Sequence, residues 1–78
     1  MNQFQILQPW LPQVLNTIKR EIKTEHLPGS HAFYRTHFGN KPISRLTIEE
    51  IFKAYETELL AGNQEIAEWV INRWVFKH

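Results

Sequence analysis

The chain has 78 residues, nine Lys or Arg, eight acidic residues that are all Glu, and a formal net charge of +1. Its length allows one domain with one modest core, and 42% hydrophobic with 22% charged residues is typical of a folded domain rather than a disordered one. The absence of Cys excludes disulfides and thiolate sites. Without an apolar run of about 18 residues or a signal-peptide start, we expect a cytoplasmic chain with no transmembrane segment.

The first predicted helix covers residues 10–26. Pro12 suits the first turn of a helix, and apolar residues then recur at helical spacing until Leu27-Pro28-Gly29 ends the pattern. The preceding residues 4–10 can form either a short turn or an extended N-terminal arm over the core, and their sequence does not decide between the two.

The second predicted helix is short and covers residues 31–38. Ser30 can cap its start, and Gly39 suits the left-handed position that follows a helix. Residues 40–46 are then predicted to be a connector, because the residue before Pro42 is disfavoured in helical geometry.

The third predicted helix begins at a capping box, Thr47-Ile48-Glu49-Glu50. In this motif the Thr47 hydroxyl accepts a hydrogen bond from the backbone amide of Glu50, and the Glu50 side chain reaches back to the amide of Thr47. Apolar residues then follow on one face, so that the helix buries one stripe and ends at Gly62.

The fourth predicted helix starts at an Asn63 cap and runs to the C-terminus. Apolar residues cover most of its circumference, and Glu65, Glu68 and Asn72 form its polar strip. This pattern fits either a central helix surrounded on three sides by the others or a helix with a docking patch. Large apolar side chains in the last turn, with no stop signal after them, favour a domain excised from a longer chain.

The spacing of polar residues argues against several kinds of chemistry. His26, His31 and His37 lack the spacing of helical metal ligands, so we expect neither a metal nor a cofactor. The paired glutamates lie on a solvated helix face and no nucleophile motif is present, so we expect no enzyme. The third and fourth predicted helices, joined by a short turn before Asn63, superficially resemble a helix-turn-helix. The fourth helix, however, begins with acidic residues and no Lys or Arg, which argues against nucleic acid as a partner.

The charge is unevenly distributed along the chain. Residues 1–45 carry six basic and two acidic groups, whereas residues 46–78 carry three basic and six acidic groups. Near the end of the second helix, cations alternate with aromatic residues, a mixture that suits phosphate or an anionic headgroup. The residues predicted to bind such a ligand are Arg35, Lys41 and Arg45, with Lys19 and Lys23 as outer contributors. The alternative is a solvated basic face that packs beside the acidic half.

Three stretches carry a resemblance to a known class of domain: His37–Ile43, Leu46–Glu50 and Asn72–His78. In these stretches the chain resembles small helical domains appended to translocated effectors of intracellular bacteria such as Legionella. The resemblance implies a targeting domain of a larger effector, translocated into a host cell and peripheral on membranes. Some such domains bind phosphoinositides. No binding residue is transferred by the resemblance.

We therefore predict an all-α fold, in which residues 1–78 form one small bundle of four helices with an N-terminal arm. The predicted function is that of a non-catalytic targeting module for an anionic ligand, with a phosphoinositide headgroup on a membrane as the specific candidate. The alternative is a protein-interaction module that docks through an apolar face of the fourth helix or through the arm. The predicted core consists of Leu15, Ile18, Ile22, Phe33, Ile51, Phe52, Tyr55, Leu59, Trp69, Val70 and Trp74.

Overall fold

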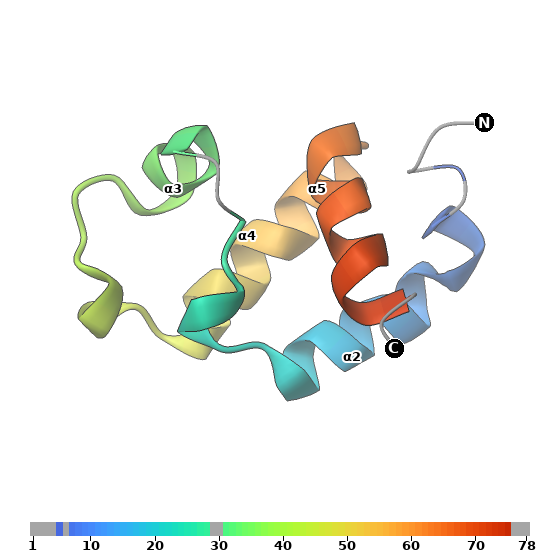
Figure 1. The fold of residues 1–78 in the computed structure, drawn as a ribbon, viewed down its shortest axis with the longest axis horizontal. Helices are drawn as coiled ribbons and strands as arrows, with labels where there is room; N and C mark the ends of the chain where they lie inside the picture. The colour runs from blue at the N-terminus through green and yellow to red at the C-terminus, as the bar shows by residue number, and fades with distance from the viewer. Residues whose placement is uncertain (1–4, 6, 29–30, 76–78) are drawn as a thin grey trace.

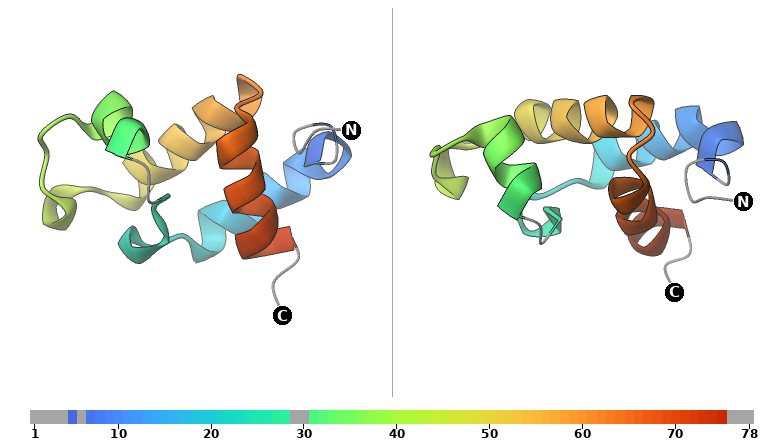
Figure 2. Two further views of the ribbon diagram at one scale, coloured as in Figure 1. Left: turned by 45° about the horizontal axis from the view of Figure 1, so that its top comes forward. Right: turned by 90° about the horizontal axis from the view of Figure 1, so that it is seen from above.

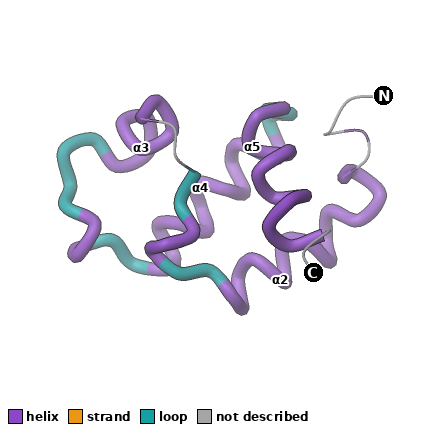
Figure 3. The backbone as a smooth tube through the Cα atoms, in the orientation of Figure 1, coloured by secondary structure: helices purple, strands orange, loops and turns teal. Residues whose placement is uncertain are grey.

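A computed structural model describes residues 5, 7–28 and 31–75 of the chain. Within these residues, four α-helices alternate with short 3-10 turns, a π-helical segment and loops, and no β-strand is present (Figure 3). The predicted all-α fold is confirmed. The predicted Ser30 cap and the last three residues of the fourth helix lie outside the described residues.

The first helix, α2 (Leu11–Glu21), is shorter than predicted. A 3-10 turn, η1 (Gln8–Trp10), precedes it, so residues 8–10 form the short turn and not an extended arm. At the other end, Ile22 has an extended backbone with φ −66° and ψ 141°, and a second 3-10 turn, η2 (Thr24–His26), follows. The prediction of one continuous helix over 10–26 is therefore wrong.

The break after α2 has a local and a distant cause. Ile22 and Thr24 are β-branched and favour a helix less than unbranched residues do. The carbonyl of His26 accepts hydrogen bonds from Tyr55 and Trp69, which lie 29 and 43 residues further along the chain. These contacts fix the direction of the segment, and local periodicity contains no sign of them.

The second helix, α3 (His31–Phe38), has the predicted bounds. Gly39 ends it with a φ of 61°, a left-handed conformation that an L side chain rarely adopts. The connector that follows contains a third 3-10 turn, η3 (Ile43–Arg45), which begins after the extended backbone of Pro42.

The third helix, α4 (Ile48–Leu60), begins at the predicted capping box, whose two reciprocal hydrogen bonds are both present. Gly62, with a φ of 80°, lies in the turn to α5 (Gln64–Val70), where the Asn63 side chain accepts from the amide of Ile66 as predicted. The helix then widens into a π-helical segment, η4 (Ile71–Val75).

α2 and α4 lie next to each other and run in roughly opposite directions, and α5 crosses them (Figures 1 and 2). α2 packs against α4 and η4, and α4 packs against α5. α3 and the connector of residues 39–47 lie at one end of the 35 Å long axis, and η1 with the start of α2 lies at the other. The connector thus projects at the end of the molecule, beyond α4.

The core lies where α2, α4 and α5 meet. Eight of the predicted core residues are buried, but Leu15, Phe52 and Trp69 are half-buried and pack against its edge, so their full burial was predicted wrongly. The fourth helix buries Ile66, Ala67 and Val70, and its predicted polar strip of Glu65, Glu68 and Asn72 is exposed. The buried apolar residues are Leu7, Val14, Ile18, Ile22, Phe33, Phe38, Leu46, Ile51, Ala54, Tyr55, Leu59, Ile66, Ala67, Val70, Ile71 and Trp74.

Candidate anion-binding surface

The connector between α3 and α4 carries two of the predicted anion-binding residues, Lys41 and Arg45. Pro42 fixes the backbone between them, and the amide of Arg45 donates to the carbonyl of Pro42 at 2.9 Å. The buried side chain of Leu46 anchors the end of the connector in the core. These constraints give the connector a defined shape.

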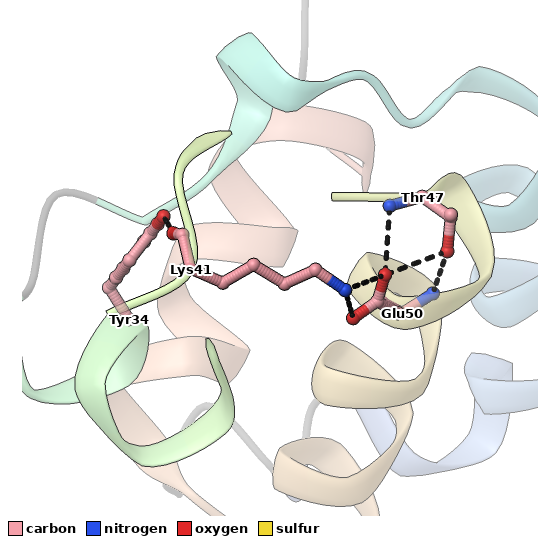
Figure 4. A network of polar contacts seen from close by, with 4 residues as sticks. All are labelled: Tyr34, Lys41, Thr47 and Glu50. Atoms are coloured by element: carbon pink, nitrogen blue, oxygen red, sulfur yellow. Dashed lines mark hydrogen bonds and ion pairs between the residues drawn. The ribbon is translucent and has the colours of Figure 1, made fainter. Parts of the chain in front are cut away.

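Lys41 is held by residues on both sides of the connector (Figure 4). Its ammonium group donates to both carboxylate oxygens of Glu50, with Nζ–Oε1 and Nζ–Oε2 distances of 2.9 and 2.8 Å. The hydroxyl of Tyr34, on α3, donates to the carbonyl of Lys41. Lys41 therefore joins the end of α3 to the first turn of α4.

The same carboxylate also completes the helix cap of α4. Oε1 of Glu50 accepts from the amide of Thr47 at 3.1 Å, and the Glu50 amide donates to the Thr47 hydroxyl at 3.2 Å. The hydrogen bond from Lys41, followed by that from Thr47, lowers the pKa of Glu50 below its ordinary value. An internal carboxylate thus occupies the N-terminus of α4, the place where an external anion would otherwise meet helix amides.

In the sequence, Arg45 lies between two exposed isoleucines. The exposed fractions are 52% for Ile43, in η3, and 42% for Ile48, in the first turn of α4. Arg45 is itself exposed. We call the side chains of Lys41, Ile43, Arg45 and Ile48 the tip surface. It combines cations with apolar groups on the connector and the first turn of α4.

The other predicted cations lie outside this surface. Arg35 is exposed on α3, one residue after Tyr34. Lys19, on α2, places its ammonium 5.9 Å from the ring centroid of Phe52, and Phe52 is one helical turn from Ile48 on the same face of α4. Lys23 was predicted on the first helix, but it lies beyond the end of α2.

Lys23 belongs to a different environment from that of the tip surface. Burial, followed by the positive charge of Arg73, lowers the pKa of His26, and the charge of Lys23 contributes in the same direction. Arg73, from the acidic half of the chain, and Lys23 thus both lower the pKa of His26. The sequence analysis did not foresee that these two cations lie near the same histidine.

The sequence analysis did not single out the two isoleucines of the tip surface. Ile43 lies in a stretch with no helical stripe of apolar residues around it, so local periodicity gave it no buried partner. The sequence did contain one signal for its exposure: Ile43 is an isolated apolar residue between Lys41 and Arg45, in a connector that contains Pro42. Ile48 belongs to the predicted buried stripe of α4, but it is exposed, so its burial was predicted wrongly.

A second polar cluster joins α3 to α4 away from the connector. The ring of His37 lies against Glu58, with 2.9 Å between Nε2 and Oε1, and Asn63 donates to Oε2 of Glu58 at 2.8 Å. The hydrogen bond from His37, then that from Asn63, lowers the pKa of Glu58. Among the described residues, no three His or Glu side chains are arranged to hold a metal ion.

No protein-family model, curated protein or solved structure shows significant similarity to this chain. The resemblance to domains of translocated effectors therefore stays a prediction from the sequence. In the described part of the chain, no helix has both the length and the apolar character needed to cross a membrane.

Proposed function

We propose that this chain is a non-catalytic module that binds an anionic ligand, and that the ligand is a phosphoinositide headgroup at a membrane surface. One observation carries the proposal: exposed Arg45 lies in the sequence between exposed Ile43, on the connector, and exposed Ile48, at the start of α4. The connector itself lies at one end of the long axis (Figure 1). A guanidinium group pairs well with phosphate oxygens, and apolar side chains beside it favour the membrane interface.

The rigidity of the connector supports binding. Lys41 is tied to Glu50 and to Tyr34, and Leu46 is buried, so little conformational freedom is left to lose when a ligand binds. Arg45 is a stronger candidate than Lys41 for the primary contact, because the carboxylate of Glu50 already neutralises the Lys41 ammonium group.

The isoleucines favour a membrane over a free phosphate compound as the source of the headgroup. A soluble anion gains from the cations alone, whereas a membrane also accepts Ile43 and Ile48 at its interface. Arg35 and Lys19 are exposed and lie outside the tip surface. We expect their charges to add attraction to an anionic membrane without direct contact.

The alternative function, protein docking through an apolar face of the fourth helix, has less support. The apolar residues Ile66, Val70 and Trp74 face the core and are buried there. The exposed apolar side chains Trp10 and Leu60 remain for a protein partner, on η1 and at the end of α4.

Liposome co-sedimentation tests the proposal. Reversing the charge at Arg45 with Arg45→Glu removes two unit charges of attraction at about 1 kcal/mol each, so binding to phosphoinositide-containing liposomes should fall about 30-fold. Lys53→Glu, the same change at an exposed site in the middle of α4, is the matched control and should weaken binding far less. Neither variant should shift the thermal melt appreciably, because exposed charges contribute little to stability.

Salt and lipid composition separate the possible outcomes. Binding should weaken steeply between about 50 and about 300 mM salt, and neutral phosphatidylcholine liposomes should bind poorly at low salt. Equal binding by Arg45→Glu and the parent protein, or no preference for anionic over neutral liposomes, would overturn the proposal and favour a protein partner.

A further inference from the structure

The imidazole of His26 lies in the interior, where the segment of residues 22–28 contacts the later helices. Its side chain is 12% exposed, and its ring meets that of Trp74 edge to face with centroids 5.6 Å apart. Its carbonyl accepts hydrogen bonds from the hydroxyl of Tyr55 and from the indole N–H of Trp69, the latter at 3.1 Å. One residue therefore ties this segment to α4, α5 and η4.

Among the described residues, no hydrogen-bond acceptor is placed to receive both N–H groups of a protonated ring. Nδ1 is buried, and none of the described residues forms a hydrogen bond with it. Nε2 lies 4.0 Å from Oε1 of Glu25, too far for a hydrogen bond, and the Glu25 side chain is largely exposed. A neutral ring fits this site, whereas an imidazolium would bring a charge and an unmet N–H donor into an apolar cluster.

The charged groups around His26 oppose one another. Glu21, from α2, and Glu25 favour protonation, and Lys23 and Arg73, from η4, disfavour it. Burial is the largest influence, and the net effect lowers the pKa of His26 below its ordinary value of 6.5. From α4 and α5 the site receives the neutral donors Tyr55 and Trp69.

We propose that protonation of His26 opens the segment of residues 22–28, so that this residue acts as a pH-sensitive lock on the fold. When the segment moves outward, water reaches the ring, and a proton from solvent binds the nitrogen that was unprotonated. The resulting imidazolium is hydrated only while the segment stays away from the core, so the open form is favoured. α3 follows this segment, and Phe33 of α3 packs on Tyr55 with ring centroids 5.5 Å apart, so opening also loosens the attachment of α3. The inference does not depend on the proposed function.

The direction of the pH effect follows from linkage. Below about pH 6.5, the open form binds a proton that the closed form excludes, so the open form gains as pH falls. For one proton, the opening equilibrium constant rises up to about tenfold per pH unit until the pH reaches the lowered pKa of the closed form. Above about pH 7.5 the lock is closed and insensitive to pH.

The test is urea unfolding of the whole chain at a series of pH values from about 7.5 to about 5. The folding equilibrium constant of the parent protein should fall severalfold below about pH 6.5, and His26→Gln should remove most of this dependence. His37→Gln is the matched control, because it removes another imidazole that contacts the interior and should leave the dependence in place. A parent protein with constant stability across this range, or a His26→Gln variant with the same pH dependence as the parent, would overturn the inference.

A direct titration covers the case in which His26→Gln fails to fold. The ring proton signals of His26 in the folded parent protein, followed by NMR, should titrate below 6.5, and the indole N–H of Trp69 should lose protection against exchange as His26 titrates. A His26 that titrates at or above 6.5 in the folded protein would overturn the inference without any variant.

Discussion

Glu58 shows how a single side chain can connect distant parts of this chain. It accepts from His37 on α3 and from Asn63 in the turn before α5, while Asn63 also caps α5 through the amide of Ile66. The carboxylate is largely buried, so both hydrogen bonds are shielded from solvent. Glu58 therefore positions two helices with respect to α4.

Loss of this charge should destabilise the protein in acid. The folded state lowers the pKa of Glu58 below 4.5, so its stabilising effect is complete above about pH 4.5 and is lost as pH falls through the lowered value. We expect Glu58→Gln to be less stable than the parent near neutral pH, and its stability to fall less steeply between about pH 4.5 and about pH 3.

Urea unfolding across this pH range checks the prediction, with Glu68→Gln as the same chemical change on the exposed face of α5. Glu68→Gln should follow the parent closely. If Glu58→Gln lost stability in acid as steeply as the parent, the contacts with His37 and Asn63 would contribute nothing to acid stability.

At the scale of elements, two adjacent leucines of α4 lie on opposite faces, one buried and one exposed. Leu59 is 0% exposed and Leu60 is 62% exposed. Leu59→Ala should cost about 2–5 kcal/mol in the free energy of unfolding, because it leaves a cavity among the side chains of the core. Leu60→Ala should cost less than about 0.5 kcal/mol. Denaturant titration compares the two, and equal losses would contradict the packing of α4.

Elements with strong local signals were predicted well from the sequence. The capping box at Thr47, the Asn63 cap and Gly39 each act within a few residues, and the starts of α4 and α5 and the end of α3 lie where these signals indicate. The end of α2 was missed, since the position of His26 depends on hydrogen bonds from Tyr55 and Trp69. Contacts across 29 and 43 residues leave no trace in helical periodicity.

In the candidate site, too, features that depend on contacts between distant residues could not be predicted from the local sequence. Arg35, on α3, and Arg45, in η3, are both exposed. The pairing of Lys41 with Glu50 joins residues nine positions apart across the connector, and the sequence did not reveal it. The exposure of Ile43 and Ile48 depends on how the connector leaves the core, which also required the fold.

At the scale of the whole molecule, polar contacts join the basic half of the chain to the acidic half. Lys41 pairs with Glu50 and His37 pairs with Glu58, in each case a residue before position 46 with one after it. Part of the uneven charge therefore stabilises the packing of α3 and the connector on α4. The exposed guanidinium groups of Arg35 and Arg45 remain at the end of the molecule where the tip surface lies.

The most direct test of the membrane proposal is to ask which apolar side chains touch lipid. Methyl signals of the protein can be measured by NMR with phosphoinositide-containing liposomes whose acyl chains carry a paramagnetic label. Leu60 is the internal control, because it is as exposed as the isoleucines but lies about 18 Å from Ile48 along α4. We predict strong broadening of Ile43 and Ile48 and none of Leu60. Broadening of Leu60 with unaffected isoleucines would contradict the proposal that this surface meets the membrane.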